Sequence, residues 1–265
     1  MAFKTCKRYM RIYRLFLAQY LKILMQSKVN FFIGFSAFFL NQLSGIVFLY
    51  LLFRNIPSLN GWSIDELMFI YGFSQIPRGI DHILTDYIWI LSGNVVVRGN
   101  FDKYLLRPLN PLFHLIAERF QPDGFGELAV GVGVCLIYGA RLDLVWKPLD
   151  ILWVILLVLG GTVIYTAIKL FFASLAFWIK RSQSILFVVY QLSNFAKYPM
   201  SIYGKAMSTL ITVVIPFAFT AFIPASFLMD RSSLGYAVGG TLIAATVSFT
   251  IAYWVWLKGI SNYES

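Results

Sequence analysis

Long apolar runs separated by short polar segments make up most of this chain. The runs lie at residues 29–53, 67–91, 124–145, 151–179, 182–198 and 232–257. About 20 apolar residues carry a helix across the hydrocarbon core of a bilayer, so these runs predict six transmembrane helices. They lack the short alternating segments that are typical of a membrane β-barrel. The pattern predicts an all-α integral membrane protein, with residues 1–265 as a single transmembrane domain.

Residues 1–28 have a different pattern, with a basic stripe at helical spacing and an aromatic and aliphatic remainder. The stripe consists of Lys7, Arg11, Arg14, Ala18 and Lys22. A helix with these two faces suits the membrane surface. The alternative is the solvated start of the first transmembrane helix. Lys22 and Lys28 interrupt any spanning run, so we expect a separate amphipathic interfacial helix.

The uncharged segment 206–229 is long enough to span, but Pro216 and Pro224 interrupt it. One interpretation is a full span, which gives seven spans and an external C-terminus. The other is an external re-entrant pair of short helices, which gives six spans and a cytoplasmic C-terminus. Broken backbone at membrane depth must be covered by protein or line a cavity. Ser63 and Glu66 have the form of a capping box that starts the second span, and a kink is expected near Pro77.

Composition and charge agree with a membrane protein and give it an orientation. Charged residues make up 13% of the chain, hydrophobic residues 59%, and the mean hydropathy is +0.72. The net charge is +10, and no acidic residue precedes Asp65. Such a basic start marks the cytoplasmic side of a membrane protein rather than a nucleic-acid-binding surface. In the six-span arrangement, the cytoplasmic segments hold fourteen Lys and Arg residues and the external segments hold six. Both termini and segment 92–123 are therefore predicted to be cytoplasmic.

Segment 92–123 is a polar island between the second and third runs. Gly99 and Asn100 form a predicted turn, and a short helix is expected over 101–106. Asn110 is a good N-cap and Pro111 suits the first position of a second short helix, expected over 111–120. The island is either a docking knob for a partner or a passive loop on its own protein, since interfacial aromatic residues serve both roles.

Charged side chains also interrupt the apolar runs. Arg78, Asp81, His82 and Asp86 lie about one helical turn apart in the second run, where His82 shares a face with Arg78 and with Asp86. Ionisable groups in a membrane indicate either a functional site, such as substrate contact or proton coupling, or an ion-paired contact between helices. Lys169 in the fourth run has the same two interpretations, and a lysine there can also snorkel towards the interface.

Signatures of catalysis are missing from the sequence. No phosphate-binding G-x-x-x-x-G-K-[ST] loop, H-E-x-x-H or G-x-S-x-G motif occurs, so no catalytic or metal-ligating residues are predicted. Cys6 and Cys135 form no disulfide or metal-binding pattern. A catalytic site made by the two carboxylates of Asp81 and Asp86 is an alternative that no other residue pattern supports.

The polar island resembles a family motif. The stretch from Gly99 to Phe113, GNFDKYLLRPLNPLF, resembles the pattern G-x-[FL]-D-x-[YF]-L-L-[RK]-P-x-[NS]-P-L of a subfamily of type-2 (ABC-2) ABC exporter permeases. Similar features are Tyr198-Pro199, the stretch 215–219 and Ile223-Pro-Ala, where the subfamily usually has Tyr-Pro-Ala. The likeness extends over essentially the whole chain.

This resemblance implies a permease that has no ATPase of its own and no cofactor. It pairs with a second permease, identical or related, in the lipid of a bacterial inner (plasma) membrane, and two copies of an ATP-binding subunit bind ATP and Mg²⁺. Segment 206–229 corresponds to external re-entrant helices, and the coupling helix lies between spans two and three. The residues expected to dock the ATPase are Gly99, Phe101, Asp102, Tyr104, Leu105, Arg107, Pro108, Asn110, Pro111, Leu112 and Phe113.

Three other functions stay open from the residues alone. A proton-coupled secondary transporter would use Asp81, His82 and Asp86 as a relay, and an intramembrane lipid-modifying enzyme would use the two aspartates. A scaffold without transport activity is the third. The cargo is not identified, because aromatic and apolar spans suit amphiphilic drugs, lipids, peptides and lipid-linked glycans equally.

Overall fold

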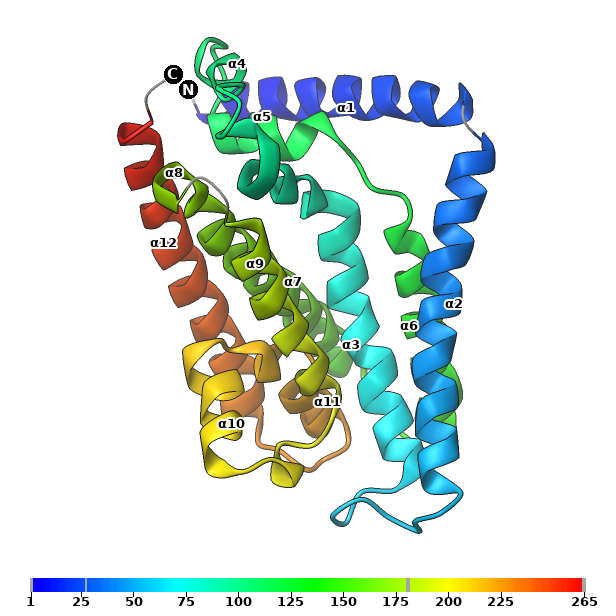
Figure 1. Ribbon diagram of the computed structural model, residues 1–265. Helices are drawn as coiled ribbons and strands as arrows, with labels where there is room; N and C mark the ends of the chain where they lie inside the picture. The colour runs from blue at the N-terminus through cyan, green and yellow to red at the C-terminus, as the bar shows by residue number, and fades with distance from the viewer. Residues whose placement is uncertain (1, 27, 180–181, 264–265) are drawn as a thin grey trace.

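The protein is a bundle of long helices with a separate helix lying across one end (Figure 1). The computed structural model describes residues 2–26, 28–179 and 182–263, and within these residues there is no β-strand. The crossing helix is α1 (Ala2–Gln26), and the side chain of Cys6 lies outside the described part. The bundle contains α2 (Lys28–Phe53), α3 (Ile64–Thr85), α6 (Gly124–Arg141), α7 (Pro148–Ser174), α9 (Gln183–Gln191) and α12 (Gly240–Ser261).

Helix α1 has the two faces that its sequence pattern predicts. The side chains of the basic stripe that begins at Lys7 are exposed, whereas Tyr9, Tyr13, Phe16 and Tyr20 are partly buried. A half-buried aromatic face opposite an exposed basic face is the form of a surface helix. In Figure 1, α1 runs roughly at right angles to the bundle.

Helix α3 is the central helix of the bundle and begins with a capping box. The Ser63 hydroxyl oxygen accepts from the Glu66 backbone N–H at 3.3 Å, and the Ser63 N–H donates to Glu66 Oε2 at 2.8 Å. The helix therefore starts three residues before the expected position, and Pro77 lies within it. Beyond Thr85 the chain continues through a 3₁₀ turn, η1 (Asp86–Ile88), and a π-helical turn, η2 (Leu91–Val95).

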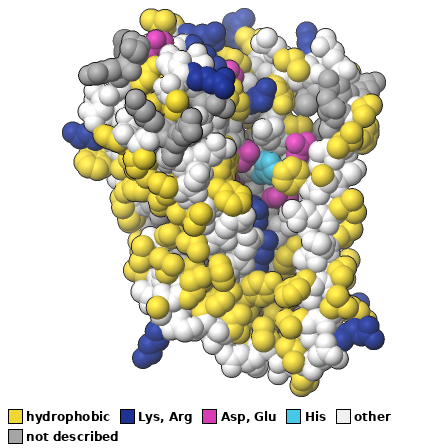
Figure 2. All heavy atoms as spheres, in the orientation of Figure 1, with side chains coloured by type: hydrophobic (Ala, Val, Ile, Leu, Met, Phe, Trp, Pro, Cys, Tyr) yellow, Lys and Arg dark blue, Asp and Glu magenta, His cyan; other side chains and the backbone are white. Residues whose placement is uncertain are grey.

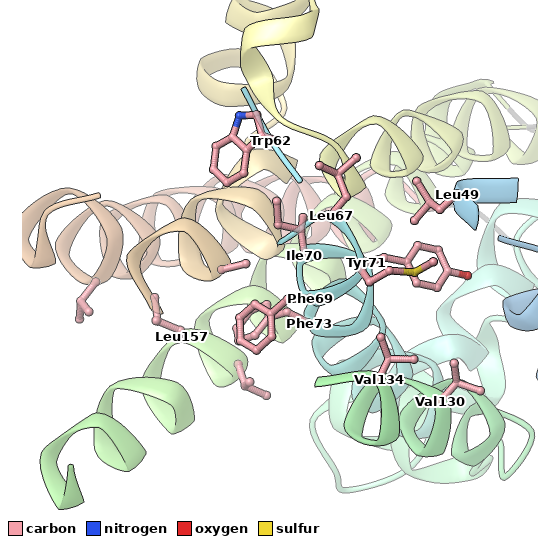
Figure 3. Close-up of a cluster of buried hydrophobic side chains, with 14 residues drawn as sticks. Leu49, Trp62, Leu67, Phe69, Ile70, Tyr71, Phe73, Val130, Val134 and Leu157 are labelled. Atoms are coloured by element: carbon pink, nitrogen blue, oxygen red, sulfur yellow. The ribbon is translucent and has the colours of Figure 1, made fainter. Parts of the chain in front are cut away.

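Glycine residues bring α3 and α6 close together. A Cβ on Gly79 would lie 2.9 Å from the backbone nitrogen of Leu128, and one on Gly131 would lie 2.9 Å from the backbone oxygen of Gly72. Small residues allow such close approach of membrane helices. Around this contact Phe69, Tyr71 and Phe73 of α3 gather with Val130 and Val134 of α6 in a buried hydrophobic cluster (Figure 3).

The second half of the chain surrounds α7, which is followed by a short helix, α8 (Ala176–Ile179). Helix α9 continues as a 3₁₀ segment, η3 (Leu192–Lys197), which ends the fifth apolar run, and a further turn, η4 (Met200–Ile202), follows. A π-helical turn, η7 (Gly235–Gly239), precedes α12, which packs along α7.

Segment 206–229 is not one continuous helix. It comprises α10 (Lys205–Thr209), η5 (Leu210–Val214), η6 (Phe217–Thr220) and α11 (Phe222–Leu228), with the break at Ile215 and Pro216. It lies at the end of the bundle opposite α1 (Figure 1). The side chains of η6 are buried, as is Pro224 in α11, whereas Ile215 and Pro216 at the break are half-buried and line a pocket.

Length and composition identify four helices that can cross a membrane, where the sequence pattern predicts six. Within the described residues they are Phe32–Phe53, Gly124–Arg141, Pro148–Ile179 and Gly235–Ser261. The second predicted span, α3, is long enough but contains Asp65, Glu66, Arg78 and Asp81. The fifth, α9 with η3, covers only residues 183–197. Both lie alongside the other helices in Figure 1.

Candidate functional site

The segment between α3 and α6 folds as a turn followed by two short helices. Gly99 has φ +68°, a left-handed conformation that favours glycine. Helix α4 (Asp102–Leu105) is shorter than expected, and α5 (Pro111–Glu118) ends two residues early. Asn110 Oδ1 accepts from the backbone N–H groups of Leu112 and Phe113 at 2.9 and 3.1 Å, as its N-cap position predicts.

Several residues expected to dock a partner are instead buried in their own protein. Phe101 and Tyr104 have no exposed surface, and Leu112 is 6% exposed. The Phe101 ring lies edge-on to Phe177 at 5.1 Å and to Trp256 at 5.6 Å between ring centroids. These side chains anchor the segment to α8 and α12, so they do not form part of an open docking surface.

The longest exposed stretch of the segment is residues 105–108, which we call the tip and which leads from the last residue of α4 towards α5. Leu106 is 84% exposed and Leu105 41%, and Arg107 and Pro108 are exposed as well. Leu106 is absent from the residues expected from the motif. The sequence could have indicated Leu106, because it is an apolar residue next to Arg107-Pro108 in a polar segment. The first short helix ends there and cannot bury its side chain. Asn110 is also exposed, and Gly99, Asp102, Pro111 and Phe113 are intermediate.

Helix α1 holds this tip from one side. The backbone N–H of Asn110 donates to the Tyr9 hydroxyl at 3.1 Å, and the Tyr9 ring packs edge-on to Phe113 with centroids 4.7 Å apart. Arg8 Nη2 donates to the Pro108 carbonyl at 3.5 Å. The aromatic face of α1 therefore contacts the second short helix directly.

Two polar contacts fix α4 against α5. Lys103 Nζ lies 2.7 Å from Glu118 Oε1, and the Tyr104 hydroxyl donates to Glu118 Oε2 at 2.6 Å. Burial alone raises the pKa of Glu118, but the hydrogen bonds from Lys103 and Tyr104 outweigh it and lower that pKa below its usual range. Arg107 Nη1 lies 3.1 Å from His114 Nε2. Burial and the Arg107 charge lower the pKa of the His114 imidazole.

A second group of charges lies within the bundle, where Asp81 of α3 meets Lys169 of α7. Their side chains have no exposed surface, and Lys169 Nζ lies 2.8 Å from Asp81 Oδ2 and 3.3 Å from Asp86 Oδ1. Lys169 therefore does not snorkel, because its amine points into the bundle. Asp81 Oδ1 also accepts from the hydroxyls of Thr85 and Thr166, at 2.6 and 2.8 Å.

Arg78 and His82 of α3 face α6. Arg78 Nε lies 3.8 Å from Glu127 Oε2, and His82 Nδ1 lies 3.7 Å from Glu127 Oε1. His82 Nε2 lies 3.9 Å from Asp86 Oδ2, so the ring stands between two carboxylates. The expected group of four is thus divided between two neighbouring helices. Glu127 was missed, although it is one of only two acidic residues in the third apolar run.

Figure 2 shows Lys or Arg, Asp or Glu and His side chains together in a hollow on a largely apolar face. Arg78, His82 and Asp86 keep 19%, 12% and 26% of their side-chain surface exposed, whereas Glu127 keeps 2%. Ion pairs across α3, α6 and α7 satisfy most of these charges. The arrangement joins the three helices and leaves a proton-accepting ring at an accessible position.

Comparison with known families gives one match that covers most of the chain. Residues 39–265 match the model of a family described as ABC-2 family transporter protein. No curated protein matches the chain. The matched range includes the charged residues of α3, the segment between α3 and α6, and the broken segment before α12.

Proposed function

The chain belongs to the ABC-2 family of transporter proteins, and we propose that it is the transmembrane permease subunit of an ATP-driven exporter. Its apolar helices and its family make it a multi-pass membrane protein. The observation that supports the finer assignment is the exposed tip at residues 105–108, which is held out from the bundle by two short helices.

The proposed partner at this tip is an ATP-binding subunit that supplies the ATP and Mg²⁺ chemistry. Leu106, Arg107 and Pro108 form a small apolar and cationic surface backed by a rigid, capped helix. Interfaces are commonly dominated by a few such residues, with arginine prominent among them. A second permease, identical or related, would complete the translocation path, with one ATP-binding subunit per permease.

The proposed topology has six spans and places both termini and the tip in the cytoplasm of a bacterial cell. The charge bias supports this orientation. The proposed orientation also agrees with the positions of α1 and the tip at one end of the bundle and of segment 206–229 at the other (Figure 1). In this arrangement α3 and α9 with η3 are the two further spans, and α10 and α11 belong to an external re-entrant segment.

The mechanism that follows is a shift between two states of the paired permeases. ATP binding would close the ATPase dimer and move the two tips, and α4 and α5 would carry this motion to α8 and α12 through Phe101 and its aromatic neighbours. A ligand shifts such an equilibrium only when it contacts the two states differently. The exposed tip supplies contacts of that kind.

The test replaces single residues of the tip and leaves the rest of the segment unchanged. We expect Arg107→Glu and Pro108→Gly to insert normally, to bind the ATPase at least tenfold more weakly and to lose coupling of ATP hydrolysis to export. Arg98→Glu is the control, because it makes the same charge change at an exposed residue ahead of the Gly99 turn. Normal ATPase pull-down, substrate-stimulated hydrolysis and export in both tip variants would sink the proposal.

A second candidate function is a proton-coupled secondary transporter, favoured by the position of His82 between Glu127 and Asp86. It predicts proton flux through the purified chain in proteoliposomes without any ATPase. The His82→Gln variant would abolish that flux. A pH-sensitive dye inside the vesicles measures it, and a chain that passes protons only together with its ATPase excludes this candidate.

A further inference from the structure

A pocket of about 430 Å³ lies where α1 meets η1 and the α4–α5 segment. One wall is made by Phe16 and Tyr20 of α1 and another by Tyr87 of η1. Gln19 and Ile23 of α1 also line it, and the rest of the lining is polar and comes from residues 103–119. The pocket shares Arg107 with the docking tip, and none of the charged residues inside the bundle lines it.

The polar lining carries an excess of positive charge. Lys103, Arg107 and Arg119 contribute three cations, and Glu118 is the one carboxylate among the lining residues. Glu118 is committed to Lys103 at 2.7 Å. The Arg119 guanidinium lies 5.4 Å above the Tyr87 ring and has no ion pair among the described residues. Its hydrogen-bond donors are therefore available to an anion.

The lining also includes a buried donor without a partner. His114 is 2% exposed, and its Nδ1 atom has no hydrogen-bond partner in the described part of the chain. A guanidinium can only donate, so the contact of Arg107 with Nε2 makes Nε2 the acceptor and leaves the ring proton on Nδ1. A buried N–H group of this kind normally has an acceptor, supplied by protein, water or ligand.

The proposed topology, with α1 as a surface helix, puts the pocket at the level of the bilayer surface. Near it α1 exposes the apolar side chains Leu21, Ile23 and Met25, at 43%, 53% and 67%. The aromatic rings of the wall belong to the residue types that gather at the height of lipid headgroups. A ligand here would have apolar chains on one side and cationic donors around its polar group on the other.

From these features we propose that the pocket binds the phosphate group of an anionic glycerophospholipid. The bound lipid would join α1 to α5, because its phosphate would contact Arg119 and Lys103 while its glycerol and upper acyl chains lie on Phe16 and Tyr20. Basic pockets at a membrane surface bind anionic headgroups in this manner. The proposal does not depend on ATP coupling or on export.

The experiment titrates the purified full-length chain in detergent with phosphatidylglycerol and counts bound lipid by native mass spectrometry. Phosphatidylcholine with the same acyl chains is the neutral comparison, and inorganic phosphate is the headgroup-free probe. We expect phosphatidylglycerol to bind preferentially, and Arg119→Gln and Lys103→Gln each to weaken its binding about fivefold. Arg119→Lys keeps the charge and should retain most of the binding.

Arg11→Gln is the matched control, because it removes one positive charge from the exposed stripe of α1, away from the pocket lining. We expect it to change phosphatidylglycerol binding less than twofold. An equal loss in this control, or equal binding of phosphatidylcholine, would show general surface attraction and overturn the proposal. If inorganic phosphate binds as tightly, with the same dependence on Arg119, the ligand is free phosphate and the lipid assignment is wrong. A monodisperse, helical Arg119→Gln variant that binds lipid normally also overturns it.

Discussion

At the scale of single residues, Lys169 shows how this protein keeps a charge in its apolar interior. The amine has no exposed surface and lies within 3.3 Å of carboxylate oxygens of both Asp81 and Asp86. The hydroxyls of Thr85, Thr166 and Tyr190 also donate hydrogen bonds to the Asp81 carboxylate. Burying an ion costs several kcal/mol, which only such close pairing and hydrogen bonding offset.

Removing one member of this pair should be much more harmful than removing both. We expect Lys169→Met to lower the free energy of unfolding by about 3–5 kcal/mol, because Asp81 is left buried without its cation. The double variant Lys169→Met with Asp81→Leu should recover most of the loss. Chemical unfolding in detergent micelles, followed by circular dichroism, measures both. A single variant as stable as the double variant would contradict this account.

His114 should make the α4–α5 contact sensitive to pH. Its pKa is lowered from the ordinary 6.5 by burial and by Arg107, so the unfolded segment takes up the proton first as the pH falls. The stabilising contribution is complete above pH 6.5 and is lost as the pH falls towards the lower pKa of the folded state. Glu118 also has a lowered pKa, but the pH range in which its contribution is lost lies below the ordinary pKa of 4.5.

The measurement is amide hydrogen exchange over residues 102–118 at pH 7.5 and pH 5.5, corrected for intrinsic rates. We expect weaker protection at pH 5.5 in the natural chain and a smaller difference in His114→Gln. Glu118→Gln is the companion variant, since Glu118 stays ionised at both values and its replacement should leave the difference in place. The same protection at both pH values would rule out this role of His114.

At the scale of elements, the close contact of α3 with α6 is the most specific packing in the bundle. The Cβ that Gly79→Ala adds would lie 2.9 Å from a backbone nitrogen of α6, which cannot rotate away as a side chain can. We expect a loss of about 1–3 kcal/mol in the free energy of unfolding from this overpacking. Thermal unfolding measures it.

Gly133→Ala on α6 is the control for this substitution, because nothing lies within 4 Å of its added Cβ. It should be neutral or slightly stabilising, since alanine favours helix more than glycine does. Equal effects of the two substitutions would mean that helix propensity, and not the space between α3 and α6, determines the result.

Patterns within one element were predictable from the sequence, whereas contacts between elements were not. The capping box at Ser63, the Asn110 cap and the stripe of α1 depend on residues a few positions apart, and all are present. The burial of Phe101 depends on Trp256 in α12, which lies more than 150 residues further along the chain. Glu127 was missed for a similar reason, because its cationic neighbour Arg78 lies on another helix.

At the scale of the whole molecule, the proposed topology puts α1 and the tip on the cytoplasmic face of the membrane and the α6–α7 loop on the external face. The loop carries Trp146, which is 48% exposed, and the tip carries Leu106. In a chain whose own two cysteines are replaced by serine, a membrane-impermeant thiol reagent should label Trp146→Cys in intact cells. It should label Leu106→Cys only after permeabilisation. The reverse result would invert the proposed topology.

The first turn of α1 and the last turn of α12 lie at the same end of the bundle (Figure 1). Two copies of the chain can therefore be joined head to tail in one polypeptide by a flexible linker that stays on one side of the bilayer. Such a tandem ensures that every pair contains one copy of each half. One half can then be the natural chain and the other can carry Arg107→Glu. Its rate of ATP hydrolysis would then show whether a single intact tip is enough to drive the pair.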